Sequence, residues 1–124
     1  MRFVNPIIFV SDIGVSAAFY RDVVGLKIEA DHGTIVIFSE HFAIHDAATL
    51  TRTVWGPDAP VADGPHGRRN LLLYFEDPDI DGCFRRMSSK VDLIHPVLEQ
   101  PWGQRVFRFH DPDGYAIEIG EPMS

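Results

Sequence analysis

The chain has little cysteine and no long apolar run. Cys83 is its one cysteine, so no intrachain disulfide can form, and a single thiol suits a reducing compartment. No apolar run approaches the roughly 18 residues that a membrane-spanning helix needs. The first residues carry no signal-peptide pattern and run directly into a strand-like segment. We therefore expect a cytoplasmic protein with no membrane partner.

Positive charge is also scarce. The 11 Lys and Arg residues face 18 Asp and Glu residues, which gives a formal net charge of −7. A nucleic-acid binder needs a basic surface to neutralise phosphates, so this balance excludes nucleic acid as the expected partner. The length of 124 residues suits one compact domain or two small half-domains that share a core, and the hydrophobic share of 45% is ordinary for a globular protein.

An internal repeat organises the chain. Asn5 precedes Asp12 by seven residues, as Asn70 precedes Asp77, and both pairs are offset by 65 (70 − 5 and 77 − 12). The same offset relates Phe19 to Phe84 and Arg21 to Arg86, and residues 43–45 (AIH) match 116–118 (AIE). A duplicated module predicts that equivalent positions of the two copies converge on one place. Those positions are Asn5, His45, Asn70 and Glu118.

Each copy reads as β-α-β-β-β, which predicts an α+β fold. Apolar, β-branched segments predict strands at 3–10, 26–30, 34–39, 42–46, 70–76, 91–95, 105–110 and 115–120. Asp12 and Asp77 are the expected helix N-caps, and Gly25 is the expected end of the first helix.

A single domain over 1–124 would then consist of modules at about 1–46 and 70–120. The Gly- and Pro-rich segment 47–69 would join them as a loop, either a linker or a functional lid, and it carries Trp55.

Alternation along the strands predicts which side chains point inward. Ala116 and Glu118 share one face of the last strand. A four-residue turn at 111–114 would place Phe107 opposite Glu118, with Arg105 on the same face. Together with Tyr74, such residues would form an aromatic-walled cup for a small-molecule ligand.

Three segments then carry a family resemblance. Residues 9–12 (FVSD), 18–26 (AFYRDVVGL) and 109–119 (FHDPDGYAIEI) resemble the vicinal oxygen chelate superfamily, which includes glyoxalase I, bleomycin-resistance proteins and extradiol dioxygenases. The resemblance implies two βαβββ modules forming a β-cup with helices on the outer face. It also implies a homodimer and one divalent metal ion, with His45 and Glu118 as its ligands and catalytic groups.

The chain departs from the metal-binding members at two positions. Asn5 and Asn70 stand where those members typically have His or Gln. An amide offers only a neutral carbonyl oxygen, whereas zinc, nickel and iron sites favour imidazole, thiolate and carboxylate. A harder cation held by Glu118, the amide oxygens and water stays open.

Each candidate residue has a second interpretation. Glu118 is a metal ligand or general base, or else a carboxylate paired with Arg105. His45 is a ligand or acid–base group, or else a hydrogen-bonded residue at the core edge. The remaining candidate substrate-binding residues have packing, capping or pairing as their alternatives: Asn5, Asn70, Tyr74, Trp55, Trp102, Arg105 and Phe107. His66, His95 and His110 are expected to be structural or exposed, and Cys83 to be buried.

Two functions are favoured, and a dimeric interaction or regulatory module is the third possibility. The first is a lyase- or isomerase-like enzyme that acts on a compound with vicinal oxygens, and the resemblance narrowly favours it. The second is a non-catalytic, dimeric drug- or metabolite-binding protein of the bleomycin-resistance kind, which needs no metal.

Overall fold

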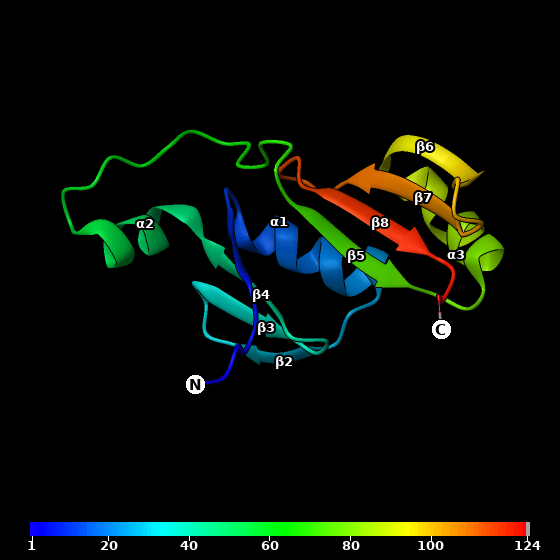
Figure 1. Cartoon of the computed structure of the whole chain (residues 1–124). Helices are drawn as coiled ribbons and strands as arrows, with labels where there is room; N and C mark the ends of the chain where they lie inside the picture. The colour runs from blue at the N-terminus through cyan, green and yellow to red at the C-terminus, as the bar shows by residue number, and fades with distance from the viewer. Residues whose placement is uncertain (124) are drawn as a thin grey trace. The chain divides into compact units, whose positions relative to one another are not determined.

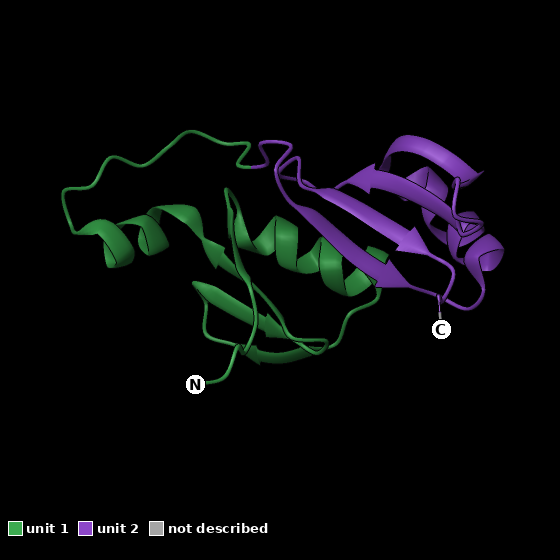
Figure 2. Cartoon of the chain, in the orientation of Figure 1, with its two compact units in different colours: residues 1–66 green, residues 67–124 purple. Residues whose placement is uncertain are grey.

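The computed structural model describes residues 1–123. The chain divides into two compact units, Met1–His66 and Gly67–Ser124 (Figure 2). Each unit contains one four-stranded sheet.

The first unit follows the predicted β-α-β-β-β order and adds a helix (Figure 1). Its elements are β1 (Ile7–Val10), α1 (Ile13–Ala18) with a π-helical continuation (Phe19–Val24), β2 (Ile28–Asp31), β3 (Ile35–Phe38), β4 (Phe42–Asp46) and α2 (Ala47–Trp55). The strand order is β1-β4-β3-β2, with β1 parallel to β4 and the other pairs antiparallel. A parallel pair needs a crossover connection, which the helix and two further strands between β1 and β4 supply.

The predicted ends of the first helix are confirmed. The Asp12 side chain accepts a hydrogen bond from the Val15 amide at 3.1 Å, as an N-cap does. Gly25 ends the π-helical continuation with φ 90°, a left-handed conformation that costs glycine no Cβ clash.

The expectation that 47–69 lacks regular structure is wrong for its first part. Residues Ala47–Trp55 form α2, which Asp46 caps by accepting hydrogen bonds from the Thr49 amide at 3.0 Å and the Thr49 hydroxyl at 2.7 Å. Gly56 ends the helix. The Gly and Pro residues that suggested a loop all follow this point, so they mark where the helix stops.

The second unit repeats the same order (Figure 1). Its elements are β5 (Leu72–Glu76), α3 (Ile80–Met87) with a 3₁₀ turn (Ser88–Lys90), β6 (Asp92–Glu99), β7 (Arg105–His110) and β8 (Ala116–Gly120). The strand order is β5-β8-β7-β6, with β5 parallel to β8 and the other pairs antiparallel. The predicted α+β fold with two βαβββ modules is confirmed.

The cap of the second helix differs from the prediction. Asp79, not Asp77, is the N-cap, and its carboxylate accepts from the Gly82 amide at 3.1 Å. Asp77 instead accepts from the Asp79 amide at 2.8 Å. Pro78 therefore lies before the helix, because an Asx-type turn at Asp77 separates the strand from the cap.

In each unit one sheet face is covered by helix and holds the core. In the first, Tyr20 packs on Phe38 and Phe42, with ring centroids 5.9 Å and 5.0 Å apart. In the second, Phe84 of α3 packs edge-on against Phe107 at 5.2 Å. We call the opposite side of each sheet its open face.

The register of β7 against β8 is shifted by one residue from the prediction. Arg108, not Phe107, lies opposite Glu118. The connecting loop contains Tyr115 as well as 111–114, because the Asp111 side chain accepts from the Tyr115 amide at 3.0 Å and the Asp111 amide donates to the Tyr115 carbonyl at 2.9 Å. Adding one residue to a hairpin loop moves every facing side chain to the other face.

Candidate functional site

One row of polar side chains crosses all four strands of the second sheet. Tyr74 on β5 is the partner of Glu118 on β8, which faces Arg108 on β7, which faces His95 on β6. Partners in register project from the same face of a sheet. The register between β6 and β7 shifts at Ile94, and this irregularity brings His95 opposite Arg108. The row lies on the open face.

Glu118 forms an ion pair at the centre of this row. Its side chain is 7% exposed, and one carboxylate oxygen, Oε1, lies 2.7 Å from Nε of Arg108. Burying a carboxylate is costly unless a cation and hydrogen bonds compensate it. Arg108 supplies both, so the pair is part of the folded structure rather than a loose surface contact.

Every nitrogen of the Arg108 guanidinium has a partner. Besides Glu118, Nη2 donates to Oε1 of Gln100 at 3.2 Å, and Nη1 lies 3.1 Å from Nε2 of His95. A guanidinium only donates, so Nε2 of His95 must accept. The proton of the neutral ring is then on Nδ1, which lies 2.7 Å from the Pro96 carbonyl oxygen and donates to it. The network therefore fixes the tautomer of His95.

The residues present do not fit the divalent metal ion that the resemblance implies. A cation at Glu118 would have to displace Arg108 or lie beside its positive charge. Across residues 1–123, no group of three or more His, Cys, Asp or Glu side chains is arranged to hold a metal ion. The two Asn residues add only neutral oxygens. We therefore assign no chemical step to a metal.

The two Asn residues lie just before the strands rather than in them. β1 begins at Ile7 and β5 begins at Leu72, so Asn5 and Asn70 each precede a strand by two residues. The side-chain amide of Asn5 donates from Nδ2 to the Pro6 carbonyl at 2.9 Å. Asn70 is exposed and lines a pocket at the start of β5 and β8.

His45 and Trp55 belong to the open face of the first sheet. His45 is the register partner of Phe9, and its Nδ1 lies 3.0 Å from the Asp46 carbonyl oxygen. Trp55 is the last residue of α2, and its ring centroid lies 6.0 Å from that of Phe9. The position of His45 in the first unit matches that of Glu118 in the second, because Ala43 pairs with Ile7 as Ala116 pairs with Leu72.

Arg105 and Phe107 lie on the other face from the one predicted. Phe107 is fully buried in the core beside α3, and Arg105 is bound to Asp81 at 3.0 Å and Glu121 at 3.4 Å. The predicted pairing of Arg105 with Glu118 is therefore wrong, and Arg108 takes that role. The cause is the five-residue loop, which the sequence pattern did not reveal.

Tyr74 and Trp102 are joined through Gln104. The Trp102 indole donates to Gln104 Oε1 at 2.9 Å, and Gln104 Nε2 donates to the Tyr74 hydroxyl at 2.8 Å. The Tyr74 hydroxyl donates in turn to Glu76 at 2.5 Å, and this hydrogen bond raises the pKa of Tyr74. The phenol is therefore held as a protonated, oriented group at the edge of the sheet.

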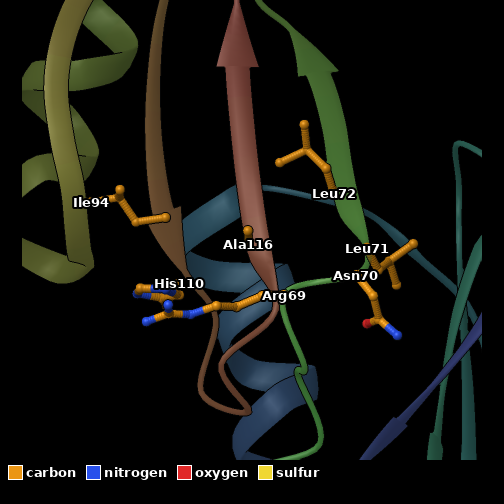
Figure 3. Close-up of a pocket in the computed structure, with 7 residues that line it drawn as sticks. All are labelled: Arg69, Asn70, Leu71, Leu72, Ile94, His110 and Ala116. Carbon is orange, nitrogen blue, oxygen red and sulfur yellow. The ribbon is translucent and has the colours of Figure 1, made fainter.

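A pocket of about 580 Å³ opens at the start of β5 and β8 (Figure 3). Its apolar lining consists of Leu71, Leu72, Ile94 and Ala116. Its polar lining consists of Arg69, Asn70 and His110. Of these polar residues, sequence reasoning singled out Asn70 alone. The correct register of β7 against β8 would have found His110, since it shares a face with Arg108.

Comparisons with known proteins agree with this fold. A family model described as a glyoxalase-like domain matches residues 3–124. A protein of unknown function from Agrobacterium tumefaciens C58 is 54% identical, with a TM-score of 0.93 over 99% of this chain and 95% of that one. A glyoxalase/bleomycin resistance protein/dioxygenase from Nocardioides is 23% identical, with a TM-score of 0.78 over 98% and 83%.

A curated sequence also matches nearly full length. Protein YaeR of Escherichia coli K12, described as uncharacterized, is 25% identical over 92% of this chain and 91% of its own. Among the helices of residues 1–123, none is long and apolar enough to cross a membrane. The family model covers almost the whole chain, and the Nocardioides structure shares its fold. The chain therefore belongs to the glyoxalase-like domain family, within the vicinal oxygen chelate superfamily.

Proposed function

We propose that this chain binds a small organic molecule on the open face of its second sheet without a divalent metal ion. The observation that carries the proposal is the 2.7 Å bond between Arg108 and Glu118. This bond engages one oxygen of the carboxylate that metal-dependent chemistry would use as ligand or base, and it places a positive charge beside that carboxylate. Of the two functions that the sequence favours, the proposed one is therefore closer to a non-catalytic binding protein than to a lyase- or isomerase-like enzyme.

The neighbourhood of the ion pair supports a ligand site. Small-molecule sites are typically apolar clefts of about 300–1,000 Å³ with a few fixed polar groups. The pocket beside the row has a volume of about 580 Å³ and mixes aliphatic and polar side chains. Arg108, His95 and Tyr74 are each held in one orientation by hydrogen bonds, which reduces the ordering cost of binding.

The test is a binding screen with and without metal. A panel of anionic, neutral and cationic small molecules is screened by ligand-detected nuclear magnetic resonance in the presence of a chelator. The screen is repeated with Mg²⁺, Mn²⁺, Zn²⁺ and Ni²⁺. We expect the same compounds to bind with the same affinity throughout. The proposal fails if binding requires an ion, if no compound binds, or if an added ion produces turnover of α-keto or hemithioacetal compounds.

Two arginines of β7 provide a matched pair of variants. Arg108→Gln removes a cation from the open face, and Arg105→Gln removes one from the opposite face. We expect Arg108→Gln to weaken binding of any compound found, and Arg105→Gln to leave it unchanged. Circular dichroism at the assay temperature shows that both variants are folded. The homodimer and the cytoplasmic location stay predictions from the sequence.

A further inference from the structure

The pocket at the start of β5 and β8 has a cationic end and an apolar floor. Figure 3 shows the Arg69 side chain extending from its loop to lie beside the imidazole of His110, with Leu72 and Ala116 on the adjoining strands. We infer that the ligand of this pocket is an organic monocarboxylate with an aliphatic body, whose charged end binds Arg69 and His110. The inference rests on the proposed function and names its ligand class.

Arg69 is available to such a ligand. Within residues 1–123, its guanidinium forms no hydrogen bond or ion pair, and the neighbouring Arg68 differs by donating to the Gly67 carbonyl at 3.2 Å. Arg69 has a left-handed backbone with φ 56°, which is uncommon for a residue with a side chain. A guanidinium offers two parallel donors to a carboxylate, so it selects this group by geometry as well as by charge.

His110 presents its second nitrogen to the same place. Its Nδ1 lies 3.1 Å from the Asp92 carboxylate, which can only accept, so Nδ1 donates. Nε2 is left without a protein partner among the described residues. Nε2 would bind an anion as a donor in the form of the ring that carries a proton on both nitrogens.

The apolar part of the lining indicates the chemistry of the uncharged part of the ligand. Leu71, Leu72 and Ile94 are each about half exposed, and all three are aliphatic. Burying them needs an apolar group, because a bare inorganic anion would leave them in water. Because the overall net charge is −7, a local cation such as Arg69 is what would attract an anion to this part of the surface. Both features point to an amphipathic carboxylate.

The experiment uses three probes that differ only in their head group. Hexanoate, hexanamide and hexylammonium are titrated into the full chain in chelator, and amide chemical shifts of the backbone report binding. We expect hexanoate to bind about tenfold more tightly than hexanamide, as one charge-assisted pair contributes. Its shifts should centre on the pocket residues, and hexylammonium should bind most weakly.

Neighbouring arginines again supply a matched control. Arg69→Gln should reduce hexanoate affinity by about tenfold and leave hexanamide unchanged, while Arg68→Gln should change neither. His110→Gln should weaken hexanoate binding as well. All three residues are at the surface, and superimposable circular dichroism spectra check that the variants fold.

The outcomes separate the two proposals. Equal binding of all three probes, or hexanoate binding that survives Arg69→Gln, overturns the inference while the proposed binding function stands. Hexanoate binding that appears only after a divalent ion is added overturns the proposed function. No binding by any probe, while other compounds of the screening panel do bind, overturns the inference alone.

Discussion

The Nε atom of Arg108 lies 2.7 Å from Oε1 of Glu118, its register partner on the neighbouring strand. The two side chains are 25% and 7% exposed, so water screens their attraction only weakly. At the matching position of the first unit, His45 faces Ile35, an aliphatic residue. The repeat therefore preserves the backbone register while the side chains differ, and among residues 1–123 only the second copy carries a buried charge pair.

Removing one member of this pair should destabilise the fold. Arg108→Gln leaves the Glu118 carboxylate buried without its cation, which typically costs about 3–5 kcal/mol. Urea denaturation followed by circular dichroism measures the loss. Arg105→Gln is the control, because that arginine forms only exposed pairs, and we expect it to change stability little. Equal losses in the two variants would contradict the structural role given to Arg108.

The helix α2 should depend on its cap. Asp46→Ala removes the acceptor for the Thr49 amide and hydroxyl, and loss of such a cap costs about 1 kcal/mol. Asp46→Asn should retain most of the stability, since Asn is a comparable cap. Thermal unfolding of the wild type, Asp46→Asn and Asp46→Ala measures the order of their stabilities. A stability of Asp46→Asn as low as that of Asp46→Ala would argue against capping.

Acid should weaken the same helix. The hydrogen bond from the Thr49 amide, followed by that from its hydroxyl, lowers the pKa of Asp46. A carboxyl with a lower pKa in the folded state stabilises that state above its unfolded pKa, and the contribution is lost as the pH falls through the folded pKa. The wild type should therefore lose more stability on acidification than Asp46→Asn. Parallel pH dependences in the two proteins would show that Asp46 is not responsible.

Two glycines should respond oppositely to alanine. A Cβ on Gly67 would lie 2.4 Å from the backbone carbonyl of Gly114, so the segment leading to β5 must shift, and such overpacking costs about 1–3 kcal/mol. A Cβ on Gly14 in α1 makes its nearest contact at 3.5 Å, to the Asp12 side chain. Gly14→Ala should stabilise the helix by up to about 1 kcal/mol. Chemical denaturation of both variants tests the contrast.

The thiol of Cys83 should be unreactive in the folded protein. Burial raises its pKa, so the nucleophilic thiolate is rare at neutral pH, and its Sγ lies 3.4 Å from Sδ of Met87 within the core. Alkylation by iodoacetamide should therefore be slow in buffer and rapid in denaturant, as measured by intact mass. Rapid labelling of the folded protein would mean that α3 opens frequently.

Much of the fold was predictable because it depends on local pattern. The bounds of β4 and β7 match the prediction, and the Asp12 and Gly25 helix signals are where the structure has them. The assignment of Glu118 to the open face followed from simple alternation with Ile117 and Ile119. The helix α2 was missed because nearby Gly and Pro residues hid a short helical segment whose cap, Asp46, ends a strand.

The site was less predictable because it depends on register. The sequence alone determined the family, the repeat and the face on which Glu118 lies, since these follow from residue types at fixed spacing. Only the tertiary structure decided the partner of Glu118, since Tyr115 joins the loop between β7 and β8 through its bonds to Asp111. One added loop residue exchanges the two faces of β7. That exchange brought Arg108 and His110 to the open face and sent Arg105 and Phe107 to the other.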